Sequence, residues 1–145
     1  MKIVFICLGN ICRSPMAEYI FKSILEDKGL SNKYIVESRA TSYEEDGNDI
    51  YPPAKKVLDK NNIKYSKHRS IRLEPSDINK YDLFVCMEDR NIINTKRIIG
   101  ESDKIIKLLD KDIDDPWYTG LFDEVYNQIY EGCIKLLDKL ESKNN

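Results

Sequence analysis

The segment from Cys7 to Ser14 holds residue types that could attack a phosphate ester. It reads Cys-Leu-Gly-Asn-Ile-Cys-Arg-Ser, so five residues separate the first cysteine from the arginine. A thiolate is a strong nucleophile, and a planar guanidinium can hold two phosphate oxygens at once. Ser14 could donate a hydrogen bond to the sulfur when Cys7 leaves. We therefore predict phosphoryl chemistry here, with Cys7 as the nucleophile and Arg13 as a phosphate ligand.

The position of this segment strengthens that prediction. Residues 3–6 are an apolar run typical of a buried strand, and residues 15–28 have helical spacing. Backbone N–H groups converge at such a strand-to-helix turn, where they bind anions and favour a thiolate. We expect Gly9 to adopt a positive φ, Asn10 to tolerate the left-handed region and brace the loop, and Ser14 to cap the helix. The predicted phosphate-binding residues are Leu8, Gly9, Asn10, Ile11, Cys12, Arg13 and Ser14.

Strand and helix patterns alternate along the rest of the chain. Further strands are predicted at 34–37, 83–87 and 105–108, and further helices at 52–61, 75–80, 89–98 and 121–140. Loops or irregular connections are predicted at 43–49, 66–72 and 111–119. This alternation favours an α/β fold: a single three-layer α/β/α domain over residues 1–145, with a four-stranded parallel sheet and a phosphate-binding loop after the first strand.

Composition narrows the function classes. The 145 residues carry a formal net charge of -2, which provides no general attraction to nucleic acid or to an anionic membrane. No secretory signal or membrane-spanning stretch is recognisable. The four cysteines (Cys7, Cys12, Cys86 and Cys133) have no zinc-site spacing, so a reducing, cytoplasmic setting is the simpler interpretation. We expect no metal and no cofactor.

Two distant motifs resemble those of the low-molecular-weight protein tyrosine phosphatases. Residues 7–18 read CLGNICRSPMAE, similar to that family's N-terminal phosphate loop, and residues 115–120 read DPWYTG, similar to its C-terminal Asp-Pro motif. The resemblance covers essentially the whole chain. It implies a monomer that hydrolyses phosphotyrosine and small aryl phosphates through a cysteinyl-phosphate intermediate.

Several carboxylates near the C-terminal motif could supply the general acid. The residues alone do not select one acid: Asp112 and Asp114 rival Asp115, and Asp110 is a weaker rival. Acidic loops are usually just solvated, so their carboxylates carry no signal of their own. The resemblance selects Asp115, the residue before Pro116, as the acid that protonates the leaving oxygen and later deprotonates water. A proline in the next position also keeps an aspartate in extended backbone.

The resemblance places a substrate cleft beside these residues. Trp117 and Tyr118 would form one wall, although such aromatic residues are also common as half-buried loop anchors. Glu44 would lie across the cleft, where the family often has an aromatic residue. Glu44, Glu45 and Asp46 would disfavour acidic peptides.

A supporting network is also implied by the resemblance. The single histidine, His68, would hold Asn10 through contacts that include Ser14, although a lone histidine in a polar segment is more often a surface residue. Ile71 departs from the family pattern, which has a basic residue there. Ser42 could join this network or serve in a turn.

Cys12 lies inside the predicted phosphate loop. It could be a small packing residue. The resemblance instead supports a reversible disulfide with Cys7, which would protect the nucleophile from irreversible oxidation.

Three other functions remain open. Arsenate reductases share this fold but add a downstream redox pair, and Cys86 has no near partner because the next cysteine is Cys133. Protein arginine phosphatases carry a smaller polar residue at the Ile11 position, so Ile11 favours the tyrosine branch. A silent phosphotyrosine-binding module would lack Cys7 or Asp115, and both are present.

Overall fold

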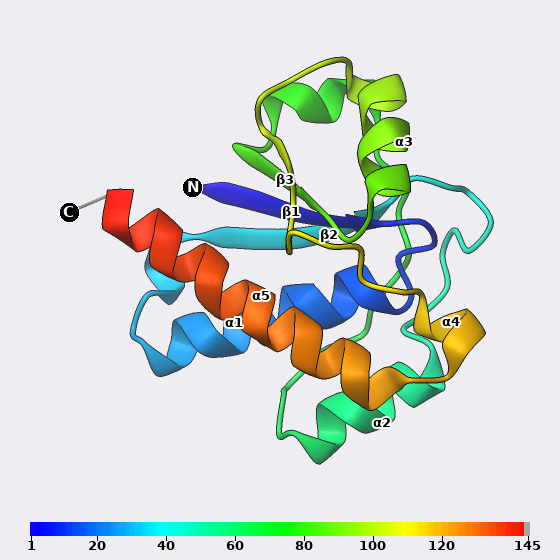
Figure 1. Cartoon of the computed structure of the whole chain (residues 1–145), viewed down its shortest axis with the longest axis vertical. Helices are drawn as coiled ribbons and strands as arrows, with labels where there is room; N and C mark the ends of the chain where they lie inside the picture. Colours follow the sequence, from blue (N-terminus) through cyan, green and yellow to red (C-terminus); the bar gives the residue numbers. More distant parts are fainter. Residues whose placement is uncertain (144–145) are drawn as a thin grey trace.

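A parallel four-stranded sheet forms the centre of the computed structural model, which describes residues 1–143 (Figure 1). Its strands are β1 (Lys2–Cys7), β2 (Ile35–Ala40), β3 (Leu83–Cys86) and β4 (Ile105–Lys107), in the order β2-β1-β3-β4. The strand order reverses beside β1: β2 follows β1 in the chain and lies on one side of it, while β3 and β4 lie on the other side. A crevice at the carboxyl end of β1 is where such sheets bind ligands. The predicted sheet is confirmed.

Helices cover both faces of the sheet, giving the three layers that the sequence predicts (Figure 1). One face carries α1 (Arg13–Asp27), α2 (Pro52–Lys60) and α5 (Phe122–Lys143). The other face carries α3 (Asp89–Ile99) and the short 3₁₀ helix η2 (Pro75–Asn79). Parallel strands joined by helical crossovers require this arrangement, because both faces of the sheet must be shielded from water.

The buried side chains form two cores, one on each side of the sheet. Ile3 and Phe5 of β1 pack into the core under α1 and α5, while Val4 and Ile6 pack toward α3. All four are fully buried, which explains the continuous apolar run in the sequence. The predicted inward residues of α5 are all buried, and they are Val125, Ile129, Cys133, Leu136, Leu137 and Leu140.

Two local predictions are wrong. Helix α1 begins at Arg13 with Cys12 as its N-cap, so Ser14 lies inside the first turn and does not cap the helix. The Ser14 hydroxyl contacts other side chains of the loop instead. The predicted loop over 111–119 ends in a one-turn helix, α4 (Pro116–Thr119). The Asp115 carboxylate begins that turn by accepting a hydrogen bond from the Trp117 N–H, 3.0 Å away.

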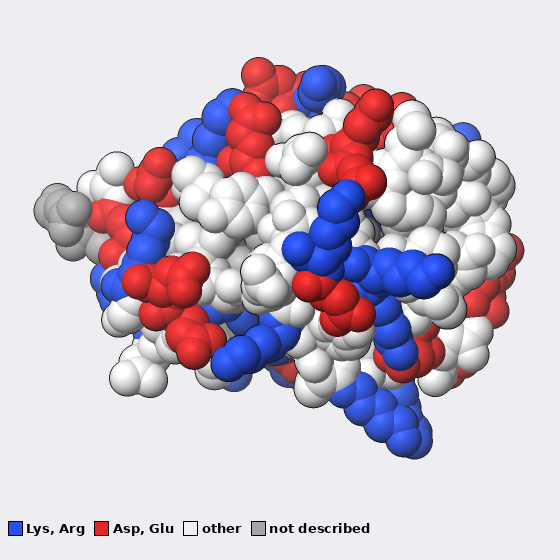
Figure 2. All heavy atoms as spheres, turned by 90° about the horizontal axis from the view of Figure 1, so that it is seen from below, with Lys and Arg blue, Asp and Glu red and all other residues white. Residues whose placement is uncertain are grey.

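The surface is strongly charged but mixed in sign. Figure 2 shows Lys and Arg side chains interspersed with Asp and Glu on the face seen from below, where α2 lies in Figure 1. Among residues 1–143, no helix has both the length and the apolar character needed to cross a bilayer.

Candidate active site

The loop after β1 curls around the sulfur of Cys7. The Asn10 N–H donates to the Cys7 Sγ over 3.2 Å, and the Ser14 Oγ lies 3.0 Å from the same sulfur. Asn10 has φ 58°, in the left-handed region as predicted, whereas Gly9 is not among the positive-φ glycines, so that prediction is wrong. Gly9 serves close approach instead, since an added Cβ would lie 3.3 Å from the Cγ of Glu45.

A buried polar network fixes the shape of this loop. The Asn10 side chain donates to the Ser14 Oγ over 2.7 Å and accepts from the Ile71 N–H over 3.2 Å. The His68 Nε2 lies 2.7 Å from the Asn10 carbonyl oxygen, and it must carry the proton because a carbonyl only accepts. His68 is therefore buried at the loop, and Ile71 contributes its backbone where the family pattern has a basic side chain.

Other contacts hold the loop backbone, and the sequence did not indicate all of them. Ser42 stays outside the Asn10 network: its Oγ accepts from the Glu44 N–H over 3.0 Å in a turn, and its own N–H donates to the Leu8 carbonyl over 3.0 Å. Ser70 donates to the Gly9 carbonyl over 2.8 Å. These bonds satisfy the Leu8 and Gly9 carbonyls with donors from outside the loop.

Arg13 has a buried guanidinium whose partners come from distant segments. Its side chain is 2% exposed. Nη1 donates to Glu88 Oε2 and to the Ile113 carbonyl, each over 2.8 Å, and Nη2 lies 3.5 Å from Asp115 Oδ2. Burial alone lowers the pKa of Arg13, but Cys7, Asp115 and Glu88 outweigh it and raise that pKa. The guanidinium therefore stays charged at the position where phosphate oxygens would bind.

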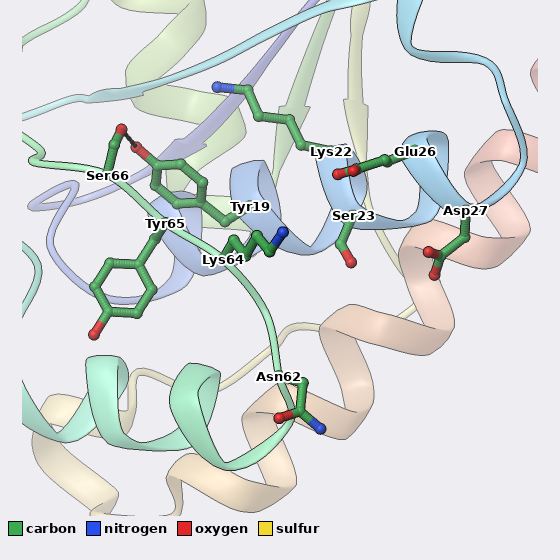
Figure 3. A pocket seen from close by; sticks show the side chains of 9 residues that line it. All are labelled: Tyr19, Lys22, Ser23, Glu26, Asp27, Asn62, Lys64, Tyr65 and Ser66. Atoms are coloured by element: carbon green, nitrogen blue, oxygen red, sulfur yellow. Dashed lines mark hydrogen bonds between the residues drawn. The ribbon is translucent and has the colours of Figure 1, made fainter.

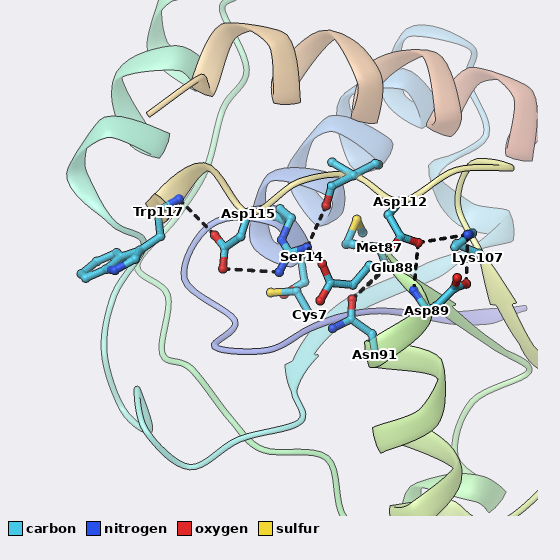
Figure 4. A network of polar contacts seen from close by, with 12 residues as sticks. Cys7, Ser14, Met87, Glu88, Asp89, Asn91, Lys107, Asp112, Asp115 and Trp117 are labelled. Carbon is cyan, nitrogen blue, oxygen red and sulfur yellow. Dashed lines mark hydrogen bonds and ion pairs between the residues drawn. The ribbon is translucent and has the colours of Figure 1, made fainter. Parts of the chain in front are cut away.

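The four aspartates considered for the general acid differ in their contacts and in whether they line the cleft. Asp112 points away from Cys7: its Oδ1 accepts from Lys107 Nζ and from the Asp89 N–H, each over 3.0 Å (Figure 4). Those two hydrogen bonds hold the pKa of Asp112 below its usual range. Asp110 and Asp114 are exposed and do not line the cleft. Asp115 lines it together with Cys7, in the extended backbone expected before a proline.

The cleft above the sulfur is small, about 60 Å³, and its rim is aromatic and acidic. Trp117 and Tyr118 line one side, and Glu44 and Glu45 also line the cleft. The Trp117 ring is 49% exposed and is supported from behind by Tyr51, whose centroid lies 4.5 Å away. Tyr118 is 79% exposed. The residues predicted for the substrate wall are thus brought together around Cys7.

Comparison with known proteins identifies the family. Residues 2–145 match the family model described as low molecular weight phosphotyrosine protein phosphatase. The chain belongs to this family. It is 32% identical, over 99% of its length and 97% of the relative's, to the low molecular weight protein-tyrosine-phosphatase YfkJ of Bacillus subtilis.

Solved structures of similar proteins agree with this assignment. The phosphatase superposes on the crystal structure of Bacillus subtilis YfkJ with a TM-score of 0.96 at 31% identity, covering 100% of this chain and 97% of that one. SP-PTP from Streptococcus pyogenes gives 0.90 at 37% identity, covering 96% and 92%. An arginine phosphatase, YwlE, gives 0.87 at 28% identity, covering 97% and 96%.

A larger hollow of about 520 Å³ lies elsewhere on the phosphatase, between α1 and the segment 62–66 (Figure 3). Tyr19 and Ser66 share a hydrogen bond of 3.2 Å at its wall. Its lining contains no cysteine, histidine or arginine. It therefore lacks the thiol and the guanidinium that lie together in the cleft at Cys7.

Glu88 is a site residue that the motifs did not reveal. It comes two residues after the end of β3, at the same edge of the sheet as the loop after β1, and it is also the N-cap of α3. A carboxylate just after a parallel strand is the signal that could have found it. The Glu88 side chain contacts Arg13 and is 23% exposed.

Replacing Glu88 with glutamine should weaken phosphate binding and turnover together. The amide keeps the side chain's shape but removes a charge-assisted hydrogen bond of about 1.5–3 kcal/mol to a buried guanidinium. We expect kcat/KM for p-nitrophenyl phosphate to fall about tenfold and the inhibition constant of inorganic phosphate to rise. Asp89→Asn is the matched control. An unchanged phosphate constant in Glu88→Gln would contradict a role for Glu88 in placing Arg13.

Proposed function

We propose that the phosphatase hydrolyses phosphotyrosine in proteins and simple aryl phosphate monoesters through a cysteinyl-phosphate intermediate. Cys7 attacks phosphorus, Arg13 and the loop N–H groups hold the equatorial oxygens, and Asp115 is the general acid. The observation that supports this most is that one cleft contains the Cys7 sulfur, the buried Arg13 and the Asp115 carboxylate. YfkJ and SP-PTP are both named as low molecular weight protein tyrosine phosphatases, which supports the same substrate.

The proposed reaction proceeds in two steps. The Cys7 sulfur forms a bond to phosphorus as the bond to the tyrosine oxygen breaks, and Asp115 gives its proton to that oxygen. Asp115 then takes a proton from water, which attacks phosphorus and releases the Cys7 thiolate. The Asn10 N–H at 3.2 Å and the Ser14 hydroxyl at 3.0 Å are placed to stabilise that thiolate.

The cleft rim supports an aromatic substrate. Trp117 presents a flat apolar ring that Tyr51 holds in place, and Tyr118 extends the same wall. Ile11, buried at the cleft, adds apolar surface and favours a phenyl ring over a guanidinium. Glu44 completes the proposed substrate wall.

Phosphoarginine is the second candidate substrate, and the acidic rim is the observation that favours it. Glu44 and Glu45 would attract a guanidinium, and the YwlE arginine phosphatase shares the fold. Arsenate reduction lacks such support, since Cys86 and Cys133 are both fully buried and burial raises the pKa of each thiol.

A substrate panel tests the proposed function. Wild-type protein is assayed with p-nitrophenyl phosphate and with one peptide carrying phosphotyrosine or phosphoarginine at the same position. We expect turnover of p-nitrophenyl phosphate and of the phosphotyrosine peptide, and little turnover of the phosphoarginine peptide. A chelator should not reduce this turnover, because Arg13 supplies the positive charge and the loop N–H groups supply hydrogen bonds to the phosphate. Selective turnover of phosphoarginine would assign the arginine branch. Binding of phosphotyrosine peptide without turnover of any ester would make the chain a binding module.

Cys12 is proposed to protect Cys7 from peroxide. Peroxide oxidises Cys7 to a sulfenic acid, and the Cys12 thiol attacks that sulfur, forming a disulfide and releasing water. Cys12 is 4% exposed and adjoins the same cleft, and both cysteines are free thiols in the structure.

Cys12→Ser should make peroxide inactivation irreversible while leaving the starting activity within a few-fold of wild type. Activity is measured after a peroxide pulse, before and after dithiothreitol. We expect most activity to return in wild type and little in the variant, because its sulfenic acid oxidises further. Equal recovery in both proteins would show that Cys12 is only a packing residue.

The setting of the reaction is also proposed. We infer a cytoplasmic setting, because the cysteines are unpaired thiols, as expected in a reducing compartment. The monomeric state is proposed from the family resemblance. The net charge of -2 supports a protein or small-molecule substrate over nucleic acid or a membrane surface.

A further inference from the structure

A groove of about 360 Å³ lies beside the catalytic cleft. Leu8 lines both hollows, so the groove adjoins the beginning of the phosphate loop. Thr41 and Tyr43 line it from the segment after β2, and Arg72 lines it from the strand-like segment that bridges to Ala40. Helix α3 contributes Asn94 and Arg97.

Among the residues that the structure describes, the two arginines of the groove have no acidic partner. The Arg72 guanidinium lies 4.7 Å from the Tyr43 ring centroid, and it donates to the Leu73 carbonyl over 3.2 Å and to the Thr41 carbonyl over 3.4 Å. Arg97 is exposed in the last turn of α3. Within residues 1–143, neither guanidinium forms an ion pair. The groove therefore holds two uncompensated positive charges.

Neutral polar groups add to this character. Asn94 precedes Arg97 by three residues, so both lie on one face of α3. Thr41 is only 8% exposed, and its buried hydroxyl has no hydrogen-bond partner. An unsatisfied buried hydroxyl is uncommon and calls for an explanation such as a ligand. No carboxylate lines the groove, since Glu44 and Glu45 line the cleft instead.

We propose that this groove is an anion subsite for the peptide substrate. It binds a carboxylate or a second phosphoryl group that lies near the phosphotyrosine, and the inference rests on the proposed function. A peptide whose phosphotyrosine enters the cleft can cross Leu8 and present a neighbouring anion to Arg72 and Arg97. The acidic rim at Glu44 and Glu45 disfavours anions there, so the preference for an acidic neighbour is limited to one side of the phosphotyrosine.

Matched peptides test the subsite. Each carries phosphotyrosine and, at one position before or after it, glutamate, phosphoserine or glutamine. We expect glutamate or phosphoserine to raise kcat/KM about fivefold over glutamine on one side only. Arg72→Gln and Arg97→Gln should each reduce that ratio toward one and leave p-nitrophenyl phosphate kinetics unchanged. The glutamate and phosphoserine arms show which anion the groove prefers.

Arg69→Gln is the matched control, because Arg69 is exposed, close in sequence and outside the groove. Three results would overturn the proposal. Wild type could show no preference for the anionic peptides at any position, the preference could survive in both Arg72→Gln and Arg97→Gln, or it could fall as much in Arg69→Gln as in those two variants. If Arg72→Gln fails to fold, Arg97→Gln on the helix surface decides. Failure of the proposed function would give a different result, because wild type would then not hydrolyse p-nitrophenyl phosphate. In that case the subsite is tested by binding alone, with fluorescence anisotropy of the same peptides on Cys7→Ser.

Discussion

Replacing Cys7 with serine should abolish hydrolysis of p-nitrophenyl phosphate and phosphotyrosine while phosphate binding persists. A serine hydroxyl ionises far less readily than a thiol, so the nucleophile is lost. The anion site remains, because Arg13 is held by Glu88 and Ile113, and the loop backbone is held by contacts such as that from His68 to Asn10. Turnover and phosphate binding by calorimetry are measured on the same preparation.

Cys12→Ser is the control for this experiment, since Cys12 is the other thiol at the cleft. While Cys7 is reduced, burial and then the negative charge of Cys7 raise the pKa of Cys12, so the Cys12 thiol stays protonated and does not replace Cys7 as the nucleophile toward phosphorus. Oxidation of Cys7 to a sulfenic acid removes that charge, and the reaction proposed above begins from that state. Activity is therefore expected to survive in Cys12→Ser. Loss of turnover in Cys12→Ser together with retained turnover in Cys7→Ser would reverse the assignment of the nucleophile.

Replacing Asp115 with asparagine should slow phosphotyrosine hydrolysis by roughly 100-fold or more, within the range typical for loss of a general acid. The loss should be smaller for p-nitrophenyl phosphate, because nitrophenolate departs without a proton far more easily than a tyrosine phenolate does. The amide oxygen of the introduced side chain can still accept from the Trp117 N–H, so the turn into α4 is kept and the change isolates the proton transfer.

The measurement compares kcat for both substrates across pH in wild type, Asp115→Asn and Asp114→Asn. Asp114 is the matched control because it is adjacent and exposed and does not line the cleft. The variant at 115 should lose more activity on phosphotyrosine than on p-nitrophenyl phosphate at every pH tested. Wild-type turnover of phosphotyrosine by Asp115→Asn, or a leaving-group-dependent loss in Asp114→Asn, would show that the acid is misassigned.

The sequence by itself determined most of the secondary-structure elements and showed that the segment from Cys7 to Ser14 lies between a strand and a helix. The apolar run of β1, the helical spacing of α5 and the prolines that open α2 are local signals, and each element appears where it was expected, within a few residues. The spacing of Cys7 and Arg13 is also local, because the same short turn carries both. Hydrophobic periodicity and turn chemistry act over a few residues, so the sequence displays them directly.

Only the tertiary structure decided which groups complete the site. Arg13 meets Glu88 and Ile113 across 75 and 100 residues of chain, and nothing local to those residues indicates the contact. The residues alone left four aspartates open; in the structure Asp112 binds Lys107, and of the four only Asp115 lines the cleft. The physical reason is the parallel sheet: its crossovers bring the carboxyl ends of β1 and β3 to one edge, so groups distant in sequence converge there.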